Sequence, residues 1–512
     1  MISMGPNTTQ VNTENRDVLR LSLAAGQWQF INMFAQQLIT IGTFLVLARI
    51  LLPQDFGVAV LIALVPTFID GITSFAFETS ALQKKEGMRP YLDVIWTFNI
   101  LRTLVILLIS FIAAPFVADF FHIEYALPAL YMAGLVVFAQ NLTNIGQGYF
   151  FLNFDFKKIF YRDVFQKIVY SVTAISLAII LHSFWAIFLA TVVSAVAGAA
   201  ITYALHPYRP SLDFAFRKLE DLRSFSQWLF GQEMMAQLER TVGDSVIGRF
   251  MTPADLGLFG KAKSLAMLAT SPIISSINKV SFSSYLHVRD SLPHIGEGIS
   301  KTFEILFAIG LPYVLAIVFA GNRLVLVLLG PNWTPLTPSL KVLTVAATIN
   351  ALTVILASAV FNGIGKPRIQ FAVGLIYTAV TLSGFFLLVP TWGILGASYA
   401  ALFGVLAAAS ITVYFILTRI PINLYRITWT VVIVALASAL PIEGALYLLD
   451  YSFFNTTLGY ILLFALAGSV YALTITLFGL VLKRGPYSTL KLVVMSVLGN
   501  ILVRPKDSSD SA

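Results

Sequence analysis

The 512-residue chain contains no cysteine and few charged residues. The absence of cysteine excludes disulfides, thiolate metal sites and a cysteine nucleophile. Only 11% of the residues are charged, whereas a soluble domain carries about 25%, and 58% are hydrophobic. So few charges cannot cover a surface that faces water, and we therefore expect lipid to surround most of the chain.

The sequence also lacks the usual signatures of an enzyme or a metalloprotein. It contains no P-loop, which excludes ATP hydrolysis by this chain. Its predicted outer loops are short, whereas a membrane glycan polymerase or ligase needs room to hold an acceptor. No two histidines have the spacing of metal ligands, and all five fall in predicted loops or at span ends: His122, His182, His206, His287 and His294. We therefore predict a protein that is not an enzyme and uses no cofactor or metal.

Long apolar runs fill most of the chain. A membrane-spanning helix needs about 20 apolar residues, and the first run, which follows a polar N-terminus, is too long for the core of a signal peptide. The pattern predicts an all-α polytopic membrane protein of about fourteen transmembrane helices. We place them at 22–47, 56–77, 94–116, 127–150, 160–181, 184–205, 224–247, 256–283, 302–328, 335–361, 367–389, 392–416, 426–448 and 457–481.

Lysine and arginine residues fall unevenly on the two sides of these spans. An even number of spans puts both termini on one side. That side holds 24 of the 33 basic residues, the other side holds 3, and the spans hold 6. Cytoplasmic loops are the ones enriched in basic residues. We therefore expect both termini in the cytoplasm, and the net charge of +8 requires no nucleic-acid partner.

The first span and its exit turn recur 200 residues later. Between 27–57 and 227–257, ten of 31 positions are identical without a gap. In the shared turn R-x3-P-x-D-x-G, Pro and Asp start the next helix and Gly allows close packing. Its residues are Arg49, Pro53, Asp55, Gly57, Arg249, Pro253, Asp255 and Gly257. Both copies begin at odd-numbered spans, so we interpret them as parallel repeats. Two similar helical hairpins without duplication would give the same pattern.

The duplication divides the chain into two six-helix lobes and two additional helices. The predicted units are a cytoplasmic tail at 1–21, an N-lobe at 22–206, a linker at 207–223, a C-lobe at 224–420, helices 13 and 14 at 421–482, and a second cytoplasmic tail at 483–512. Transporters with such repeats place their substrate site where the repeats meet. We therefore expect the functional residues between the lobes.

Polar residues form a stripe on the first helix of each lobe. The stripe in span 7 has spacings of 4, 3 and 4 residues, which one helix face would hold, and consists of Glu233, Gln237, Arg240 and Asp244. The stripe in span 1 has spacings of 3 and 4, and consists of Gln29, Asn32 and Gln36. One interpretation is that both stripes line a water-filled cleft between the lobes. The other is that they are polar contacts between packed helices.

Further charges fall inside the predicted spans. A charge at the bilayer centre costs at least about 2.5 kcal/mol and persists only beside a cavity or a partner. The candidate cations for an anionic cargo, such as a phosphate or pyrophosphate group, are Arg102, Arg240, Lys341 and Lys279. Asp70 joins the stripe residues as a candidate for ion coupling, whereas Lys261 and Lys263 lie near the outer end, from which they can snorkel to the surface. A self-compensating network of ion pairs fits the same charges equally well.

Several motifs, taken in order, resemble those of a known family. They are L-A-R-I-L-L-P-Q-D-F-G (47–57), G-D-S-V-I-G-R-F-M-T-P-A-D-L-G-L-F (243–259), L-L-G-P-N-W (328–333) and G-I-G-K-P (363–367). They are similar to motifs of the polysaccharide transporter family, the lipid-linked oligosaccharide flippases of the multidrug/oligosaccharidyl-lipid/polysaccharide exporter superfamily. The resemblance implies an inverted-V bundle of two six-helix lobes plus two helices in the bacterial cytoplasmic membrane.

The same resemblance implies a flippase that moves undecaprenyl-pyrophosphate-linked sugar units by alternating access, for O-antigen, capsule or exopolysaccharide assembly. Its partners would be this glycan, membrane lipids, a coupling H+ or Na+, and the polymerase and glycosyltransferases of the pathway. Arg102, Arg240 and Lys341 would hold the pyrophosphate, and Asp70, Glu233 or Asp244 would couple to the ion. The alternatives are a drug/cation antiporter of the same superfamily, which the excess of cations in the spans disfavours, and a membrane glycan polymerase or ligase.

Overall fold

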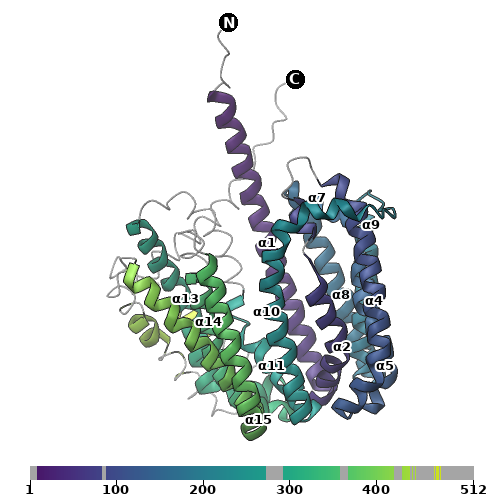
Figure 1. Cartoon of the computed structure of the whole chain (residues 1–512). Coiled ribbons are helices and arrows are strands. Elements are labelled where there is room, and N and C mark those ends of the chain that lie inside the picture. Colours follow the sequence, from purple (N-terminus) through teal and green to yellow (C-terminus); the bar gives the residue numbers. More distant parts are fainter. Residues whose placement is uncertain are drawn as a thin grey trace.

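Membrane-spanning helices make up the structure (Figure 1). The computed structural model describes residues 8–75, 77–82, 88–271, 292–357 and 367–419, with separate short pieces between 429 and 473. In these ranges every regular element is a helix, because in lipid each backbone N–H and C=O must find its partner within the segment. The protein is an all-α polytopic membrane protein, as the sequence predicts.

The N-terminal half, from α1 to α9, is one group of packed helices. In it, α8 packs along α9 and α1, and α4 packs on α5 and α6. The helix bounds are α1 Thr8–Ile50, α2 Pro53–Thr73, α3 Phe77–Leu82, α4 Arg89–Phe121, α5 Leu127–Met132, α6 Gly134–Asn141, α7 Gly148–Leu152, α8 Phe156–Leu181 and α9 Trp185–Leu205, with 3-10 turns η1 at Glu124–Ala126 and η2 at Ile145–Gln147.

The C-terminal half, from α10 to α15, is a second group. In it, α15 packs against α10 and α14, and α14 also packs against α11 and α13. The bounds are α10 Glu220–Phe250, α11 Pro253–Ala266, α13 Leu292–Leu328, α14 Thr337–Ala357 and α15 Pro367–Arg419, with 3-10 turns η3 at Phe216–Leu219 and η4 at Pro331–Leu336. Figure 1 shows α13 to α15 on one side, α4, α5, α8 and α9 on the other, and α10 and α11 between them.

Seven of the described helices are long and apolar enough to cross a membrane, or eight if a bent pair counts as one span. The bent pair, Glu124–Asn141 and Ile145–Leu152, turns by 51° where we predict one continuous fourth span. α10 is not among the seven because of the charges in its sequence. α15 combines the predicted spans 11 and 12, which Gly393 separates with a φ of 57°. Predicted spans 13 and 14 lie largely outside the described residues, so the total of fourteen stays a prediction.

The exit turns of the two repeat copies start α2 and α11 as the sequence predicts. Pro53 and Pro253 are the first residues of these helices. At this position the N–H would have no acceptor within the helix, so proline, which lacks an N–H, is tolerated. Asp55 and Asp255 each accept a hydrogen bond from the backbone N–H three residues earlier, at 3.0 and 3.1 Å. Each carboxylate therefore lies at the positive end of its helix dipole.

The two exit turns lie directly against each other. A Cβ atom placed on Gly57 would lie 1.7 Å from the carbonyl oxygen of Pro253, and one on Gly257 would lie 1.9 Å from that of Pro53. These reciprocal contacts relate the two turns by an approximate two-fold axis, as parallel repeats require. We call this end of the bundle, where residues 50–53 and 250–253 meet, the turn end.

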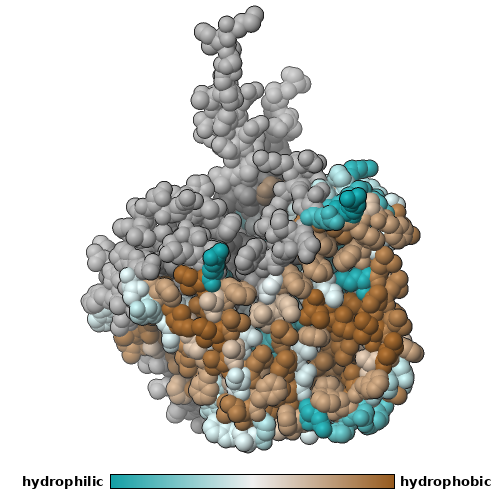
Figure 2. Space-filling view, viewed as in Figure 1, coloured by the Kyte–Doolittle hydropathy of each residue, from teal (hydrophilic) through white to brown (hydrophobic). Residues whose placement is uncertain are grey.

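The apolar core is concentrated near the turn end, where the two halves meet. Leu61 of α2, Ile247 of α10, Leu256 of α11 and Trp333 of η4 are completely buried in one cluster. The outer surface is apolar as well. Figure 2 shows a broad hydrophobic belt, with hydrophilic residues gathered toward its two ends. An apolar belt of this kind is suited to contact with the lipid tails of a bilayer.

Candidate functional site

Two arginines from the repeated turn join the halves reciprocally at the turn end. Arg49, at the end of α1, donates hydrogen bonds to the carbonyl oxygens of Leu328, at 3.3 Å, and Val327. These carbonyls belong to the last turn of α13 in the other half. Arg249, at the end of α10, donates to His122 Nε2 at 3.1 Å, and His122 caps the end of α4. Helix C-termini carry unpaired carbonyls and a partial negative charge, which attract a guanidinium group.

The tryptophan of the L-L-G-P-N-W motif adds an apolar contact between the halves. Trp333 is completely buried, and its Nε1 donates to the carbonyl oxygen of Ala48 in α1 at 2.9 Å. Its ring meets the edges of Phe44 and Phe56 at centroid distances of 5.4 and 5.2 Å. Lys261 of α11 lies over the same two phenylalanines. Its ammonium therefore lies between the halves. This differs from our prediction that the Lys261 side chain reaches the membrane surface.

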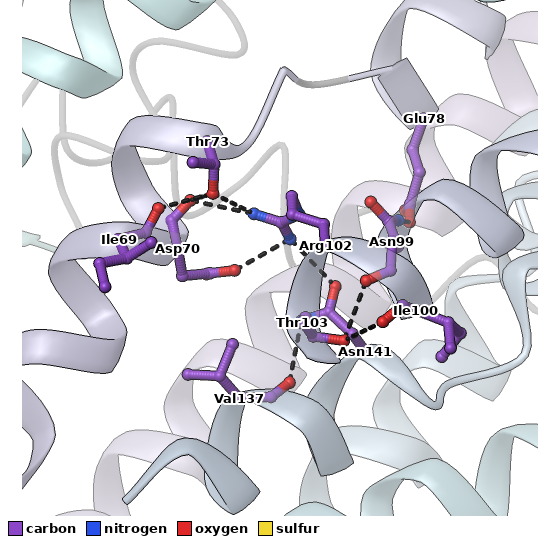
Figure 3. Close-up of polar contacts among 10 residues, drawn as sticks. All are labelled: Ile69, Asp70, Thr73, Glu78, Asn99, Ile100, Arg102, Thr103, Val137 and Asn141. Atoms are coloured by element: carbon purple, nitrogen blue, oxygen red, sulfur yellow. Dashed lines mark hydrogen bonds and ion pairs between the residues drawn. The ribbon is translucent and has the colours of Figure 1, made fainter. Parts of the chain in front are cut away.

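Arg102 and Asp70 form an ion pair inside the N-terminal half (Figure 3). The guanidinium of Arg102 lies 2.9 Å from Asp70 Oδ1, and the Arg102 side chain is only 9% exposed. Arg102 also donates to Thr73 Oγ1 and to the Asp70 carbonyl, both at 3.1 Å, and to Asn141 Oδ1 at 3.3 Å. Because these contacts tie α4 to α2 and α6, the ion-pair interpretation of the internal charges fits Arg102 better than the cargo interpretation.

The polar stripe of α1 faces α8 within the same half. Asn32 is 2% exposed, and its Nδ2 donates to Asp163 Oδ2 at 2.8 Å. Gln36 donates to Asn32 Oδ1 at 3.1 Å and to Asp163 Oδ2 at 3.2 Å. Arg162 pairs with the second oxygen of this carboxylate at 2.6 Å. For Asn32 and Gln36 the structure supports contacts between packed helices rather than the walls of a cleft, whereas Gln29 is partly exposed one turn away.

The stripe of α10 meets the other half of the protein. Gln237 is 9% exposed and lies against Gly71 of α2, where an added Cβ would be 2.5 Å from the Gln237 side chain. Arg240 is exposed and donates to Gln237 Oε1 at 3.0 Å. Gln237 in turn donates to Thr241 Oγ1 at 3.1 Å. The stripe therefore contains both a contact between the halves and an exposed cation one turn from it.

A second polar group lies inside the C-terminal half, beside a cavity of about 40 Å³. Glu239 of α10 accepts a hydrogen bond from the Tyr377 hydroxyl at 3.2 Å, and its carboxylate lies 3.6 Å from the ammonium of Lys263. Asp244 interacts electrostatically with both Glu239 and Lys263. Asn350 also lines the cavity. A space of this size holds a water molecule or a small cation.

The remaining candidates are spread over the chain. Lys341 lies one turn into α14, near the turn end, and packs beside Gly321 of α13. The backbone of Glu233 belongs to α10, and its side chain lies outside the described part. Lys279 and most of the G-I-G-K-P turn also lie outside the described residues. Among the candidates whose side chains the structure describes, Asp70 lies with Arg102, and Gln237 lies with Arg240, which also interacts electrostatically with Asp244. These described candidates do not all meet at one point.

Sequence reasoning did not single out three residues that organise these contacts. Asp163 accepts hydrogen bonds from the α1 stripe, the Tyr377 hydroxyl donates to Glu239, and Trp333 packs between the halves and donates to Ala48. Asp163 has a signal, since it is an acid three residues inside the predicted fifth span. Trp333 stands in a family-like motif, but its burial between the halves depends on a contact with α1. Tyr377 lies in an apolar run without any local signal.

Comparison with known proteins places these features in a family. The family described as "Polysaccharide biosynthesis protein" matches residues 46–338, more than half of the chain. The chain belongs to this family. The matched range includes both exit turns, the α10 stripe and Trp333. The resemblance to polysaccharide transporters that the motifs carry is thereby confirmed.

Two relatives of this polysaccharide biosynthesis protein are named for glycan assembly. The lipopolysaccharide biosynthesis protein WzxC of Escherichia coli (strain K12) is 20% identical over 319 residues, 60% of this chain and 63% of WzxC. The succinoglycan biosynthesis transport protein ExoT of Rhizobium meliloti (strain 1021) is 24% identical over 306 residues, 59% of this chain and 62% of ExoT. The alignments therefore span less than two thirds of either relative.

Solved structures share the fold. The lipid II flippase MurJ, in an inward closed conformation, superposes with a TM-score of 0.69 at 13% identity, over 89% of this chain and 99% of MurJ. The Vibrio cholerae MATE transporter VcmN in its bent form superposes with a TM-score of 0.53 at 15% identity, over 77% of this chain and 96% of VcmN. At such low identity these likenesses establish the polytopic helical fold alone.

Proposed function

We propose that the protein is a flippase that carries polyprenyl-pyrophosphate-linked oligosaccharides from the cytoplasmic to the outer leaflet by alternating access. One observation carries this proposal: a member of a polysaccharide biosynthesis family has two repeated halves joined reciprocally at one end by Arg49 and Arg249. Such contacts can open and reform as the halves tilt, because each consists of a few polar contacts at the protein surface. Related names in lipopolysaccharide and succinoglycan assembly support a glycan cargo.

Arg240 is our first candidate for holding the pyrophosphate. It is exposed on α10 one turn from the contact between Gln237 and Gly71 of α2, so a ligand between the halves can reach it. Arg102 is buried and paired with Asp70, and a cation that is already neutralised attracts an anion weakly. We therefore assign Arg102 a structural role, and we keep Lys341 and Lys279 as further candidates for cargo binding.

Ion coupling is best placed in the C-terminal half. Glu239, Lys263, Asn350 and Tyr377 line a cavity large enough for a small ion, and Asp244 lies in the same electrostatic neighbourhood. Of the predicted coupling residues, Asp244 fits this role better than Asp70, which is paired with Arg102. The coupling ion is H+ or Na+. The upstream glycosyltransferases would supply the cargo on the side of the termini, and a polymerase would use it on the other side.

The test is translocation in vesicles of a polyprenyl-pyrophosphate-linked oligosaccharide that carries a fluorophore on its sugar. A membrane-impermeant reductant added outside reports the fraction of sugar in the outer leaflet. We expect the wild-type chain to accelerate transfer well above empty vesicles, and Arg240→Gln to slow it roughly tenfold or more, since a hydrogen bond to a charged group contributes about 1.5–3 kcal/mol.

The matched control is Arg217→Gln, which removes an exposed charge from the linker between the halves. It should leave the rate unchanged. Transfer no faster than in empty vesicles would refute the flippase assignment, and uptake of cationic drugs by the same vesicles would then favour the antiporter. A normal rate for Arg240→Gln would remove only Arg240 from the mechanism.

A further inference from the structure

The two reciprocal arginines of the turn end differ in the chemistry of their acceptors. Arg49 donates to the backbone carbonyl oxygens of Leu328 and Val327, and a backbone carbonyl accepts hydrogen bonds at every physiological pH. Arg249 instead meets Nε2 of His122, at a distance of 3.1 Å, and histidine is the side-chain type that changes its charge between pH 5 and 8. The repeat therefore builds the same contact twice, and only the second copy has an acceptor that a proton can remove.

The contact between Arg249 and His122 requires a neutral imidazole ring. A guanidinium group stays protonated and can only donate hydrogen bonds. Nε2 of His122 therefore accepts, which it can do only while the single ring proton is on Nδ1. Protonation of the ring makes both of its nitrogens donors and leaves two positive charges with their nitrogen atoms 3.1 Å apart. One proton thus turns an attraction between the halves into a repulsion.

Other titratable groups lie on the elements that pack around the end of α4. They are Asp119 on α4 itself, Glu124 and Tyr125 in η1, Asp55 at the start of α2, Tyr131 on α5 and Arg249 on α10. Of these residue types and histidine, only histidine ordinarily changes its charge between pH 5 and 8. Replacement of His122 alone separates its response to pH from any response of these neighbours.

The backbone gives His122 a matched counterpart elsewhere at a helix end. His122 is the C-cap of α4 in the left-handed conformation, with a φ of 55°, and its N–H donates to the carbonyl oxygen of Asp119 at 3.2 Å. His182 is the C-cap of α8 in the same conformation, with a φ of 46°. Histidine is among the residues that tolerate this conformation. Within the described residues only His122 of the two bonds to Arg249, so His182 serves as a control for the cap.

We propose that His122 is a pH switch for the closure of the turn end. The neutral ring accepts the hydrogen bond of Arg249 and helps to hold the halves together. Acid on the turn-end side of the membrane protonates the ring and breaks this contact, so that the turn end opens more often although the Arg49 contacts persist. Both Arg249 and His122 are exposed, which lets protons reach the ring from water. With both termini in the cytoplasm, as the basic residues predict, this acid is outside the cell membrane.

The switch rests on the alternating access of the proposed function, and spin-label distances test it in the full-length chain in lipid nanodiscs without cargo. The labels are attached at Phe116→Cys on α4 and Leu387→Cys on α15, one in each half and both 72% exposed. Between about pH 8 and about pH 5.5 we expect the ratio of open to closed molecules to rise at least roughly fivefold, because a hydrogen bond of average strength is lost.

Three kinds of variant make the result specific to this contact. His122→Gln should stay closed at both pH values, because its amide oxygen can replace Nε2 as the acceptor and does not titrate. His122→Asn should also abolish the pH response, and asparagine suits the left-handed conformation. Arg249→Gln should open more often at both pH values and respond little to pH. His182→Gln is the matched control and should respond to pH as the wild type does.

A single eluting species and a cooperative thermal transition show that each variant is folded. A pH response of folded His122→Gln and His122→Asn equal to that of the wild type would overturn the switch, as would a wild-type population that does not change with pH. Loss of the response in His182→Gln would overturn it too, because the effect would then not depend on the Arg249 contact.

Oligosaccharide transfer in vesicles decides the proposed function separately, since the populations are counted without cargo. A pH response in a chain that transfers no oligosaccharide would uphold the switch and refute only the flippase. Transfer by a chain whose populations do not respond to pH would do the reverse.

Discussion

The reciprocal arginines at the turn end make the closed state directly testable. Replacing both Arg49 and Arg249 with Gln removes the charged contacts to the ends of α13 and α4. A hydrogen bond to a charged group contributes about 1.5–3 kcal/mol when it is well shielded, and a cation at a helix C-terminus contributes about 0.3–1 kcal/mol. Both arginines are exposed, so we take about 1 kcal/mol for each.

The magnitude is sufficient to change the population visibly. Because the two contacts are separate, their losses should add to about 2 kcal/mol, roughly a 30-fold shift toward the state that is open at the turn end. If about 1% of wild-type molecules are open, about 23% of the double variant would be open. Each single variant should shift the equilibrium roughly fivefold, because each arginine contributes about 1 kcal/mol.

Spin-label distance measurements can count these populations. The chain has no cysteine, so Phe116→Cys on α4 and Leu387→Cys on α15 need no removal of native thiols, and both positions are 72% exposed on the lipid face. We expect a single distance in the wild-type background and an additional, longer distance in Arg49→Gln/Arg249→Gln. Arg217→Gln is the charge-matched control. An unchanged distance distribution in the double variant would refute the role of these arginines in closure.

Two further predictions concern packing and burial. Gly57→Ala should lower the melting temperature and slow transport, because its Cβ would lie 1.7 Å from the Pro253 carbonyl oxygen and overpacking costs about 1–3 kcal/mol. The control is Gly42→Ala, whose Cβ would have nothing within 4 Å. Equal melting temperatures of the two variants would contradict the close contact at Gly57. Arg102→Leu should destabilise the chain by about 1.5–3 kcal/mol, because Asp70, whose side chain is 33% exposed, loses its charged partner. Adding Asp70→Leu should recover most of that loss. Thermal melting of the single and the double variant beside the wild type checks this, and a double variant as unstable as the single would count against the ion pair.

The internal charges separate into two kinds once their partners are known. Asp70 with Arg102, and Glu239 with Lys263, are compensated inside one half. Arg240 and Lys261 lie instead at the contact between the halves. Cargo binding by the second kind would act on the contact between the halves, whereas the first kind would hold each half rigid as it moves.

The sequence by itself determined the membrane class, the starts of α2 and α11 and the repeat. These follow from local physics: apolar length sets the spans, and Pro and Asp set helix starts within a few residues of themselves. The glycine of the turn predicts close packing, but only the structure shows that Gly57 packs against Gly257.

Only the tertiary structure decided what each polar face touches. Helical periodicity puts Asn32 and Gln36 on one face of α1, but it does not show that this face meets Asp163 of α8 rather than a cleft. Arg102 looked like a cargo cation until its position beside Asp70 and Asn141 was known. Lys261 looked like a surface lysine until Phe44 and Phe56 were found around it. Such pairings join residues far apart in the chain, and their distances follow from how whole helices pack, which no local pattern encodes.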